Sequence, residues 1–454
     1  MSRNLSFLSI ILLVAACKSA SEPEAAREVT QYSIEQFLNT TSISGGSFSH
    51  DESRLLISSN QSGIFNAYSI PVTGGEPTAL TQSSGSSVYA VSFFPEDDRL
   101  LYSADNNGNE LYHLFVKTED GQVTDLTPDT TARAQFYGWA KDDRHFYYGY
   151  NSRDHRFMDV YQMDIEGFKP TLLYQNDQGM DFGGISGDQQ WMALSKSINT
   201  NDADLYLYHF PDKKLTKINS NQAGHSPADF SVDNQYLYYL TDDGSEYSYL
   251  AKYELASGTM SKELETNWDI SYAYFSHNGK YRVVGINEDG KTVVQVAEAA
   301  TGKAVNFPQF DSGDITGVNI SRSENQVSFM VGSSSSPNNL YHWAFGAGDA
   351  KKLTNTMNPE INVDDLVTAE VVRFPSFDEL KIPAIYYKPK QASSENKVPA
   401  LVLVHGGPGG QSRQNYSAMT QYLVNHGYAV LAVNNRGSSG YGKTFFQMDD
   451  QNHG

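Results

Sequence analysis

A short motif recurs along most of the chain at an almost constant spacing. Each copy is a bulky apolar residue followed by a polar turn, which in most copies ends in an acidic residue. The steps between copies are 46, 45, 46, 45, 45 and 45 residues. A regular period of this length indicates a repeat architecture, in which each unit packs on its neighbours. The copies begin at Phe48, Phe94, Trp139, Ile185, Phe230, Phe275 and Ile320.

Each unit has the pattern of short β-strands. One strand ends at the apolar residue, and a second, rich in aromatic and β-branched residues, follows the turn, as at residues 99–102. A Gly/Asn/Asp-rich loop leads to a third strand, as at residues 111–115, and a last short strand closes many units, as at residues 351–354. Four strands at this period predict a seven-bladed β-propeller. A stacked solenoid is the alternative, disfavoured because the strands alternate apolar and polar residues.

The overall charge narrows the range of partners. With 53 acidic against 33 basic residues, the formal net charge is -20, which disfavours nucleic acid and anionic lipid surfaces. Acidic residues in the repeated turns raise the question of a metal site. Carboxylates in turns commonly accept backbone hydrogen bonds, so we assign them that role and expect neither a metal nor a cofactor. These residues are Asp51, Asp97, Asp142, Asp188 and Asp233.

The start of the chain predicts a targeting signal. An apolar run at residues 5–14 is too short for a stable membrane span, and two alanines precede Cys17, the only cysteine. This segment resembles a bacterial lipoprotein signal, and an ordinary secretory signal with an incidental thiol is the alternative. The resemblance implies lipidation at Cys17 and a polar tether at residues 18–30. Lys18 after the cysteine favours the outer membrane, facing the periplasm.

Past the repeats, the sequence changes to an α/β pattern. A strand hairpin is followed by an apolar run, a glycine cluster, a helical stretch and a second apolar run. Continuous apolar strands are those covered on both faces, so we expect a parallel, right-handed βαβ unit whose glycine N–H groups lie at the strand end. Before the repeats, Ser33 and Gln36 predict a capped short helix. The α/β segments lie at residues 369–374, 380–387, 399–404, 405–410, 417–426 and 428–433.

Two glycine-rich motifs carry a resemblance to a known family. HGGPGG at residues 405–410 and NNRGSSGYG at residues 434–442 follow consecutive predicted strands behind the propeller. The segment at residues 372–378 and the predicted helix near Tyr32 fit the same family. In this combination the chain resembles the prolyl oligopeptidases, and within them the acylaminoacyl peptidases, over nearly all of its length. The resemblance implies a serine hydrolase of short peptides, whose propeller gates an α/β-hydrolase domain with a Ser-His-Asp triad.

The resemblance also implies roles for loop residues. Gly407 is the candidate for one of the two backbone N–H donors of the oxyanion hole, and Gly406 and Pro408 shape its loop. His405 is expected to be a structural partner, because the catalytic base of this family comes late in the domain. Arg436 is expected to tie backbone carbonyls together in its loop, in preference to binding substrate.

The residues that would complete the triad do not occur in the sequence. A nucleophile elbow reads Gly-x-Ser-x-Gly, and the chain has no such pentapeptide. The segment that most resembles a nucleophile elbow is residues 224–228. It lies on a predicted turn into the fifth blade, where Pro227 excludes a helix interior. The acid and base that follow a nucleophile are missing too. We therefore predict that this chain is inactive as it stands. In the topology that the resemblance implies, the strand at residues 400–404 pairs on one side with the strand that carries the nucleophile, so without that strand we expect an exposed apolar edge.

Three interpretations of function compete. The first is a lipid-anchored oligopeptidase whose recorded sequence stops early. The second is a noncatalytic lipid-anchored propeller that binds a ligand in the cell envelope, and the third is an esterase whose triad lies on a separate chain. Exopeptidase and endopeptidase action both stay open. The predicted organisation is a signal with its lipid-accepting cysteine at 1–17, a tether at 18–30, an all-β seven-bladed propeller with a short N-terminal helix at 31–360, and the first part of an α/β-hydrolase domain at 361–454.

Overall fold

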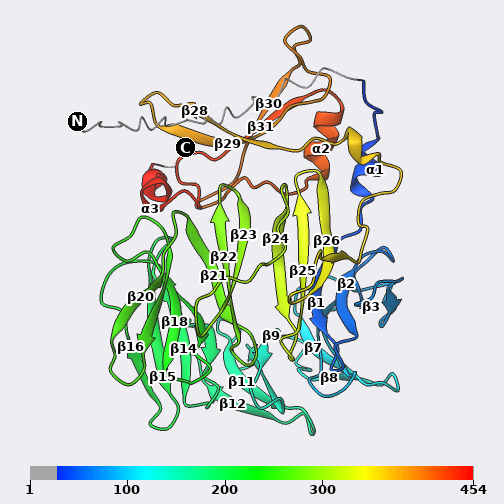
Figure 1. The fold of residues 1–454 in the computed structure, drawn as a ribbon. Coiled ribbons are helices and arrows are strands. Elements are labelled where there is room, and N and C mark those ends of the chain that lie inside the picture. Colours follow the sequence, from blue (N-terminus) through cyan, green and yellow to red (C-terminus); the bar gives the residue numbers. More distant parts are fainter. Residues whose placement is uncertain (1–27, 453–454) are drawn as a thin grey trace, which may run out of the picture.

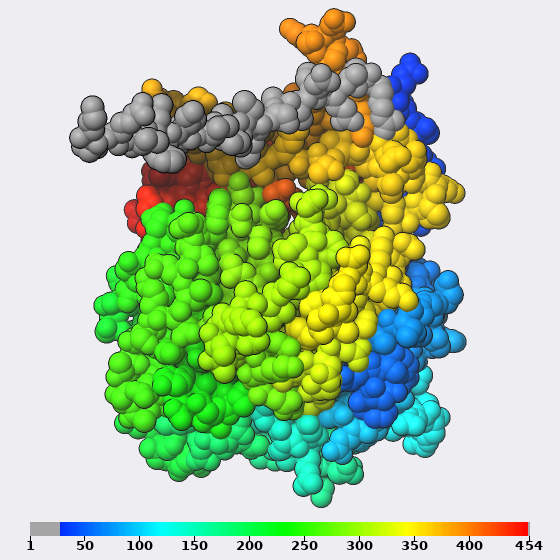
Figure 2. Space-filling model, viewed as in Figure 1, coloured from blue at the N-terminus to red at the C-terminus, as the bar shows by residue number. Residues whose placement is uncertain are grey.

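The computed structural model describes residues 28–452; the predicted signal, Cys17 and most of the tether lie outside them. Seven antiparallel sheets form a ring, and an eighth, mixed sheet covers one face of the ring (Figure 1). Residues 370–452, which we call the C-terminal module, lie directly against that face (Figure 2). The predicted propeller followed by the opening of an α/β sheet is confirmed.

Each ring sheet, or blade, is a contiguous stretch of chain whose strands pair in sequence order. Blade 1 contains β1 (Ile43–Phe48), β2 (Arg54–Ser59), β3 (Asn66–Pro71) and β4 (Thr78–Ala79). Blade 2 contains β5 (Val88–Phe93), β6 (Leu100–Ala104), β7 (His113–Lys117) and β8 (Val123–Asp125). Blade 3 contains β9 (Ala134–Trp139), β10 (His145–Tyr150), β11 (Asp159–Asp164) and β12 (Pro170–Tyr174). Blade 4 contains β13 (Asp181–Ile185), β14 (Trp191–Ser197), β15 (Ala203–His209) and β16 (Lys214–Lys217).

The remaining blades include the one departure from four strands among residues 28–452. Blade 6 has three strands, and an isolated bridge between Ala297 and Ala304 stands where the fourth would lie. Blade 5 contains β17 (His225–Phe230), β18 (Tyr236–Thr241), β19 (Tyr249–Glu254) and β20 (Met260–Leu264). Blade 6 contains β21 (Asp269–Phe275), β22 (Tyr281–Glu288) and β23 (Lys291–Glu298). Blade 7 contains β24 (Asp314–Ile320), β25 (Gln326–Ser333), β26 (Ser336–Ala344) and β27 (Lys351–Lys352).

The first strand of each blade lies toward the ring axis. β13 contacts β17, β17 contacts β21, and β1 contacts both β5 and β24, so these strands follow one another around the centre and close the circle. In all seven blades the pairing of the first strand with the second shifts register once. Such bulges increase local twist, which lets a flat repeat unit become a strongly twisted blade.

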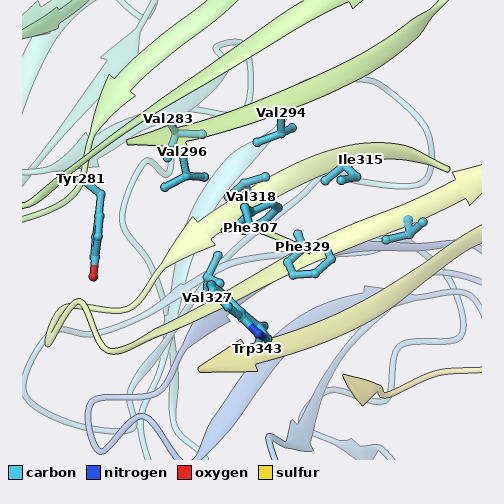
Figure 3. Close-up of a cluster of buried hydrophobic side chains, with 11 residues drawn as sticks. Tyr281, Val283, Val294, Val296, Phe307, Ile315, Val318, Val327, Phe329 and Trp343 are labelled. Atoms are coloured by element: carbon cyan, nitrogen blue, oxygen red, sulfur yellow. The ribbon is translucent and has the colours of Figure 1, made fainter. Parts of the chain in front are cut away.

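Hydrophobic side chains fill the space between neighbouring blades. Between blades 6 and 7 a cluster joins Val283 and Val296 to Phe329 and Trp343, and Phe307 enters it from the segment that replaces the fourth strand (Figure 3). Phe329 has no exposed surface. Every blade therefore depends on its neighbours for burial, which is why the period of the sequence predicted a closed ring.

The turns between the first and second strands form the face of the ring away from the C-terminal module, here called the turn face. The five aspartates of these turns each accept a hydrogen bond from the backbone N–H two residues further on, as expected. Blade 3 also reaches across the ring. Lys141 Nζ donates to the His277 carbonyl of blade 6 over 2.8 Å, and Asp143 pairs with Arg322 of blade 7. Blades 6 and 7 stand opposite blade 3, so these contacts cross the central channel.

The C-terminal module contains a sheet of order β28-β29-β31-β30. The hairpin of β28 (Glu370–Pro375) and β29 (Lys381–Tyr387) pairs antiparallel with β31 (Ala429–Val433), and β31 pairs parallel with β30 (Ala400–Val404) through α2 (Ala418–Asn425). These elements match the predicted βαβ unit. β30 is an edge strand with 62% of Val402 and 66% of Val404 exposed, which confirms the expected apolar edge.

The N-terminal helix packs on the C-terminal module. α1 (Ile34–Leu38) begins at Ser33, whose side chain forms the predicted capping box with Gln36. Phe37 on this helix stacks edge-on against Tyr422 of α2, and Asn425 Oδ1 accepts the backbone N–H of Tyr32 over 3.0 Å. The helix therefore packs on the C-terminal module, whereas the sequence analysis grouped it with the propeller. The short 3-10 helix η1 (Val363–Asp365) lies nearby, and its Asp365 accepts a hydrogen bond from the Tyr32 hydroxyl over 2.9 Å.

Two further elements end the described chain, α3 (Lys443–Phe446) and η2 (Gln447–Asp449), and they sit over blade 5 (Figure 1). None of the helices in residues 28–452 combines the length and apolar character needed to cross a bilayer. In the same residues, no three His, Cys, Asp or Glu side chains gather as metal ligands.

Candidate functional site

The glycine cluster after β30 forms a tight loop in which several positions have no room for a side chain. A Cβ at Gly410 would lie 2.1 Å from the Gly406 carbonyl oxygen, and one at Gly409 would lie 2.8 Å from the ring of Phe446. At Gly407 a Cβ would meet only the Gly409 nitrogen, at 3.7 Å. The loop is therefore crowded on its inner side and open at Gly407.

The open side of this loop carries free backbone donors. Within residues 28–452, the N–H groups of Gly406, Gly407 and Gly409 have no hydrogen-bond acceptor. Gly407 and Pro408 line a cavity of about 770 Å³ together with Arg436 and Asn452. Unpaired N–H groups at the carboxyl end of a strand can hold an oxygen that carries negative charge, which is the chemistry expected of an oxyanion hole.

His405 joins the two glycine-rich loops. Its Nε2 lies 2.7 Å from Ser438 Oγ, and its Nδ1 lies 2.9 Å from the Gly406 carbonyl oxygen. The Ser438 hydroxyl, which is fully buried, donates to the Asn435 carbonyl over 2.6 Å. Both ring nitrogens face loop atoms, an arrangement that suits a structural role.

Arg436 contacts the β28–β29 turn. Its Nη1 donates to Ser376 Oγ over 3.1 Å, its Nη2 pairs with Asp378 at 2.6 Å, and its guanidinium lies over the Phe377 ring at 4.7 Å. The hydrogen bond from Arg436 lowers the pKa of Asp378. The sequence analysis expected backbone carbonyls as its partners; the structure shows side chains of a neighbouring turn instead, because residues 376–379 lie beside this loop in space.

The second glycine motif is shaped by the propeller. Glu246, from the loop before β19, accepts the Thr444 N–H and hydroxyl over 2.9 and 2.7 Å, and its carbonyl accepts the Lys443 N–H over 2.7 Å. Gly442 has φ +92°, and a Cβ there would lie 2.5 Å from Glu246 Oε1. At Gly440, φ is +81° and a Cβ would lie 2.4 Å from Asn287 Nδ2. These glycines allow the module loop to approach blades 5 and 6.

Arg413 makes a second connection between the module and the ring. Its Nη2 donates to Thr292 Oγ1 over 2.9 Å, and its Nη1 donates to Asn287 Oδ1 over 3.1 Å. Asn434, at the end of β31, is fully buried and has partners for all its side-chain atoms: it accepts the Ser412 N–H, and donates to the Ser412 carbonyl and to the Tyr441 hydroxyl. The module loops are thus fixed relative to one another and to blade 6.

A second cavity, of about 430 Å³, lies between these loops and the ring. It is bounded by the beginnings of blades 5 and 6, the β14–β15 loop of blade 4, and residues 439–443. Four carboxylates and one lysine line it, so its charge is negative: Asp202, Asp242, Glu246, Asp269 and Lys443. Lys443 Nζ lies 3.3 Å from Asp242, and burial, with Asp242 and Glu246 nearby, raises the pKa of Asp269.

His225 and Asn201 also line this cavity, and the sequence analysis did not select them. Residues 224–228 were considered only as an imitation of the nucleophile elbow, on a predicted turn. The structure places His225 at the first position of β17 instead, with Pro227 inside the strand, next to the β-bulge. A lone histidine at a strand start gives no signal in one sequence, because its environment is set by residues far away in the chain.

Comparison with known proteins adds independent information. The family model described as prolyl oligopeptidase, N-terminal beta-propeller domain, matches residues 77–356. A model described as acetyl xylan esterase matches residues 343–454. The first match includes more than half of the chain and coincides with most of the ring.

Individual relatives agree with this assignment. Dipeptidyl aminopeptidase BIII of Pseudoxanthomonas mexicana is 27% identical over 406 residues, which cover 84% of this chain and 58% of that protein. Dipeptidyl peptidase family member 6 of Caenorhabditis elegans is 27% identical over 405 residues, covering 76% and 52%. The chain spans about half the length of these curated relatives.

A solved structure shows the same fold. A puromycin-hydrolyzing peptidase of Mycobacterium tuberculosis superposes with a TM-score of 0.75 over 93% of this chain and 71% of that one, at 14% identity. The likeness extends from the propeller into the module that carries the glycine loops. With a seven-bladed ring, an α/β module at its face and a family match across the repeats, the chain belongs to the prolyl oligopeptidase family of peptidases.

Proposed function

We propose that this protein acts as a serine-type oligopeptidase, which hydrolyses short peptides by acyl transfer while the propeller restricts access. The observation that carries the proposal is the free N–H of Gly407 above a cavity at the carboxyl end of β30. Attack on a peptide carbonyl creates a negatively charged oxygen. A fixed, unpaired N–H stabilises that charge without reorganisation in the transition state. The family of the chain and the names of its relatives agree with a peptide substrate.

The remaining catalytic groups are assigned to sequence beyond residue 454. A serine nucleophile, its general base and an orienting acid are required, and the residue after the nucleophile supplies the second oxyanion donor. The exposed edge of β30, with Val402 and Val404 outward, supports the addition of a further strand beside it. Since residues 1–454 contain no Gly-x-Ser-x-Gly, the chain by itself is proposed to be inactive.

The cavity between the ring and the module suits one end of a peptide. Its volume of about 430 Å³ lies within the range of ordinary small-ligand sites. Its surplus of carboxylates favours a protonated amine over a carboxylate. We therefore assign short peptides with a free amino group as the preferred substrates.

The protein is proposed to be held at the outer membrane by a lipid on Cys17, facing the periplasm. Incorporation of labelled palmitate into the protein, lost in Cys17→Ser, is the expected result. Incorporation that persists in the variant contradicts the anchor.

Labelling with a fluorophosphonate tests the activity. The native protein is isolated from its source cells, treated with the probe, and the locus is sequenced past codon 454. Labelling at a mass well above 50.3 kDa, with a Gly-x-Ser-x-Gly sequence after codon 454, supports the peptidase. A stop codon directly after 454 and no labelling contradict it, and favour the noncatalytic, lipid-anchored binding protein.

A further inference from the structure

One propeller residue, Glu246, is hydrogen-bonded to the start of α3. The carbonyl oxygen of Glu246 accepts the Lys443 N–H over 2.7 Å, and its two carboxylate oxygens accept the N–H and the hydroxyl of Thr444 over 2.9 and 2.7 Å. Gly442, the N-cap residue of this helix, has no side chain that could accept such bonds. Blade 5 therefore supplies the cap that α3 cannot supply for itself.

The helix α3 in turn contacts the glycine loop that carries the N–H of Gly407. The ring of Phe446 lies so close to Gly409 that a Cβ on this glycine would be 2.8 Å from it. The φ of Gly409 is +74°, a conformation that favours glycine independently of the contact. Phe446 thus packs directly against the residue two positions after Gly407.

The second glycine motif contacts the same loop through a hydrogen bond. The Ser439 N–H donates to the Gly410 carbonyl over 3.1 Å, and the Gly437 N–H donates to the Phe445 carbonyl of α3 over 3.0 Å. The motif and α3 are therefore bonded to each other, and each of them contacts the Gly407 loop.

Gly407 itself has few contacts that could hold it in place. Its N–H has no acceptor among residues 28–452, and only the Gly409 nitrogen lies within 4 Å of the position that its Cβ would take. The position of this N–H therefore depends on the contacts of Gly409 and Gly410. A catalytic group must be held to within a fraction of an ångström, so these contacts matter for a donor to the oxyanion.

We propose that Glu246 is a positioning residue for the oxyanion hole, which acts from the propeller through α3 and Phe446 on the loop of Gly407. This inference rests on the proposed function, because that function assigns Gly407 as an oxyanion donor. Glu246 does not touch the substrate in this role. Its carboxylate serves as the hydrogen-bond acceptor for Thr444, and its negative charge is not required.

The alternative role for Glu246 is the attraction of a substrate amine, because this residue also lines the acidic cavity. Two substitutions separate the roles. Glu246→Gln keeps an oxygen that accepts the Thr444 N–H and removes the charge, whereas Glu246→Ala removes both. The Glu246 side chain is exposed, so neither substitution leaves a buried cavity, and both variants are expected to fold.

The first test records the glycine amide signals of the 454-residue chain by nuclear magnetic resonance, with isotope-labelled glycine. The signal of Gly407 is identified by its loss in Gly407→Ala. We expect this signal to shift in Glu246→Ala and to stay at its parent position in Glu246→Gln. An unchanged Gly407 signal in Glu246→Ala overturns the proposal, and so does an equal shift in both variants.

Arg373→Met is the matched control. The Arg373 guanidinium on β28 pairs with Asp289 of blade 6 at 2.8 Å, and its side chain is 40% exposed, so this pair is another exposed contact between the module and the ring. The Gly407 signal is expected to stay at its parent position in this variant. A shift as large as that in Glu246→Ala would show that any loss of docking disturbs the loop, which contradicts a specific role for Glu246.

The second test measures steady-state peptide hydrolysis by the longer native protein that the proposed function requires. The oxyanion exists only in the transition state and the intermediate that follows it. Glu246→Ala is therefore expected to lower kcat about tenfold and to leave KM unchanged. Glu246→Gln and Arg373→Met are expected to keep the parent kcat. A raised KM with an unchanged kcat in both Glu246 variants overturns the proposal and indicates that the charge binds substrate.

The two tests distinguish failure of this inference from failure of the proposed function. A native protein without peptidase activity contradicts the proposed function, whereas the Gly407 signal of the 454-residue chain still decides whether Glu246 positions the loop. An active native protein whose kcat is the same in Glu246→Ala as in the parent supports the peptidase and overturns the role of Glu246.

Discussion

The two faces of the propeller treat their buried polar groups differently. On the turn face, Glu324 is 4% exposed and its carboxylate accepts the backbone N–H groups of Asn278 and Lys280 at 2.8 and 3.3 Å. On the face toward the C-terminal module, the buried ring nitrogens of His225 and Oδ1 of Asn201 have no close hydrogen-bond partner among residues 28–452, and both residues line a cavity. Unpaired buried groups lower stability, so a protein retains them where they serve function. Paired groups on the turn face hold the ring together, whereas the module face contains the cavity.

Removing a paired group from the turn face is expected to have the largest effect on stability. Glu324→Ala leaves two backbone N–H groups of blade 6 without their acceptor. We expect the free energy of unfolding to fall by about 1–3 kcal/mol, measured by urea denaturation followed by circular dichroism. Glu52→Ala, which removes more exposed contacts to Ser323 on the same face, serves as control and should cost less. Equal losses would contradict the importance of burial.

A side chain at Gly442 tests the contact between the ring and the module. Gly442→Ala introduces a Cβ 2.5 Å from Glu246 Oε1 at a φ of +92°. The strain and the clash together should lower stability by about 1–2 kcal/mol in urea denaturation. Gly427→Ala isolates the backbone strain, because φ there is +87° and no atom lies within 4 Å of the Cβ.

A double-mutant cycle separates the effect of the clash from the effect of the backbone strain. Glu246→Ala removes the side chain that Gly442→Ala would meet. The two substitutions together should therefore cost less than the sum of the single ones. Additive losses, or equal losses for Gly442→Ala and Gly427→Ala, would show that Glu246 does not fix the loop.

The sequence predicted those features that arise from local pattern. The spacing of the repeats predicted the ring, Ser33 and Gln36 predicted the capping box, and the aspartates of the turns were assigned backbone hydrogen bonds that the structure shows. Each of these depends on residues within a few positions or on a fixed period. The edge strand β30 followed from the resemblance to the peptidase family.

Features that depend on distant neighbours were not predictable. Blade 6 has three strands because residues 299–313 form a loop and a single bridge, which the period does not reveal. Arg436 binds the turn at Ser376 and Asp378, which are 60 and 58 residues away in the chain. His225 lines a cavity whose wall also includes blade 4 and the module loop, so no pattern around residue 225 indicates its surroundings.

The contacts across the channel should make a smaller contribution than Glu324. Arg322 and Asp143 are both about one-third exposed, so water and salt screen the pair. Arg322→Met is expected to lower the free energy of unfolding by about 0–1 kcal/mol, and the difference from the parent should shrink as salt is added. Thermal melting at low and high ionic strength measures this. A loss that does not depend on salt would indicate that packing of the arginine side chain, and not its charge, stabilises the ring.

The pH dependence of stability is the test with the smallest expected effect on the comparison between the two faces of the propeller. Burial lowers the pKa of His225 below its usual value, so the folded protein keeps the ring neutral where the unfolded chain already binds a proton. As pH falls below about 6.5, the unfolded state is therefore favoured and stability declines. His277 and His342, whose pKa values are also lowered by burial, act in the same direction.

Melting temperatures between about pH 8 and 5 should fall less steeply in His225→Phe than in the parent, because one of these groups is gone. An unchanged slope would mean that His225 is protonated as easily in the folded ring as in the unfolded chain. Its nitrogens would then be paired with solvent, and the difference between the two faces would disappear at this residue.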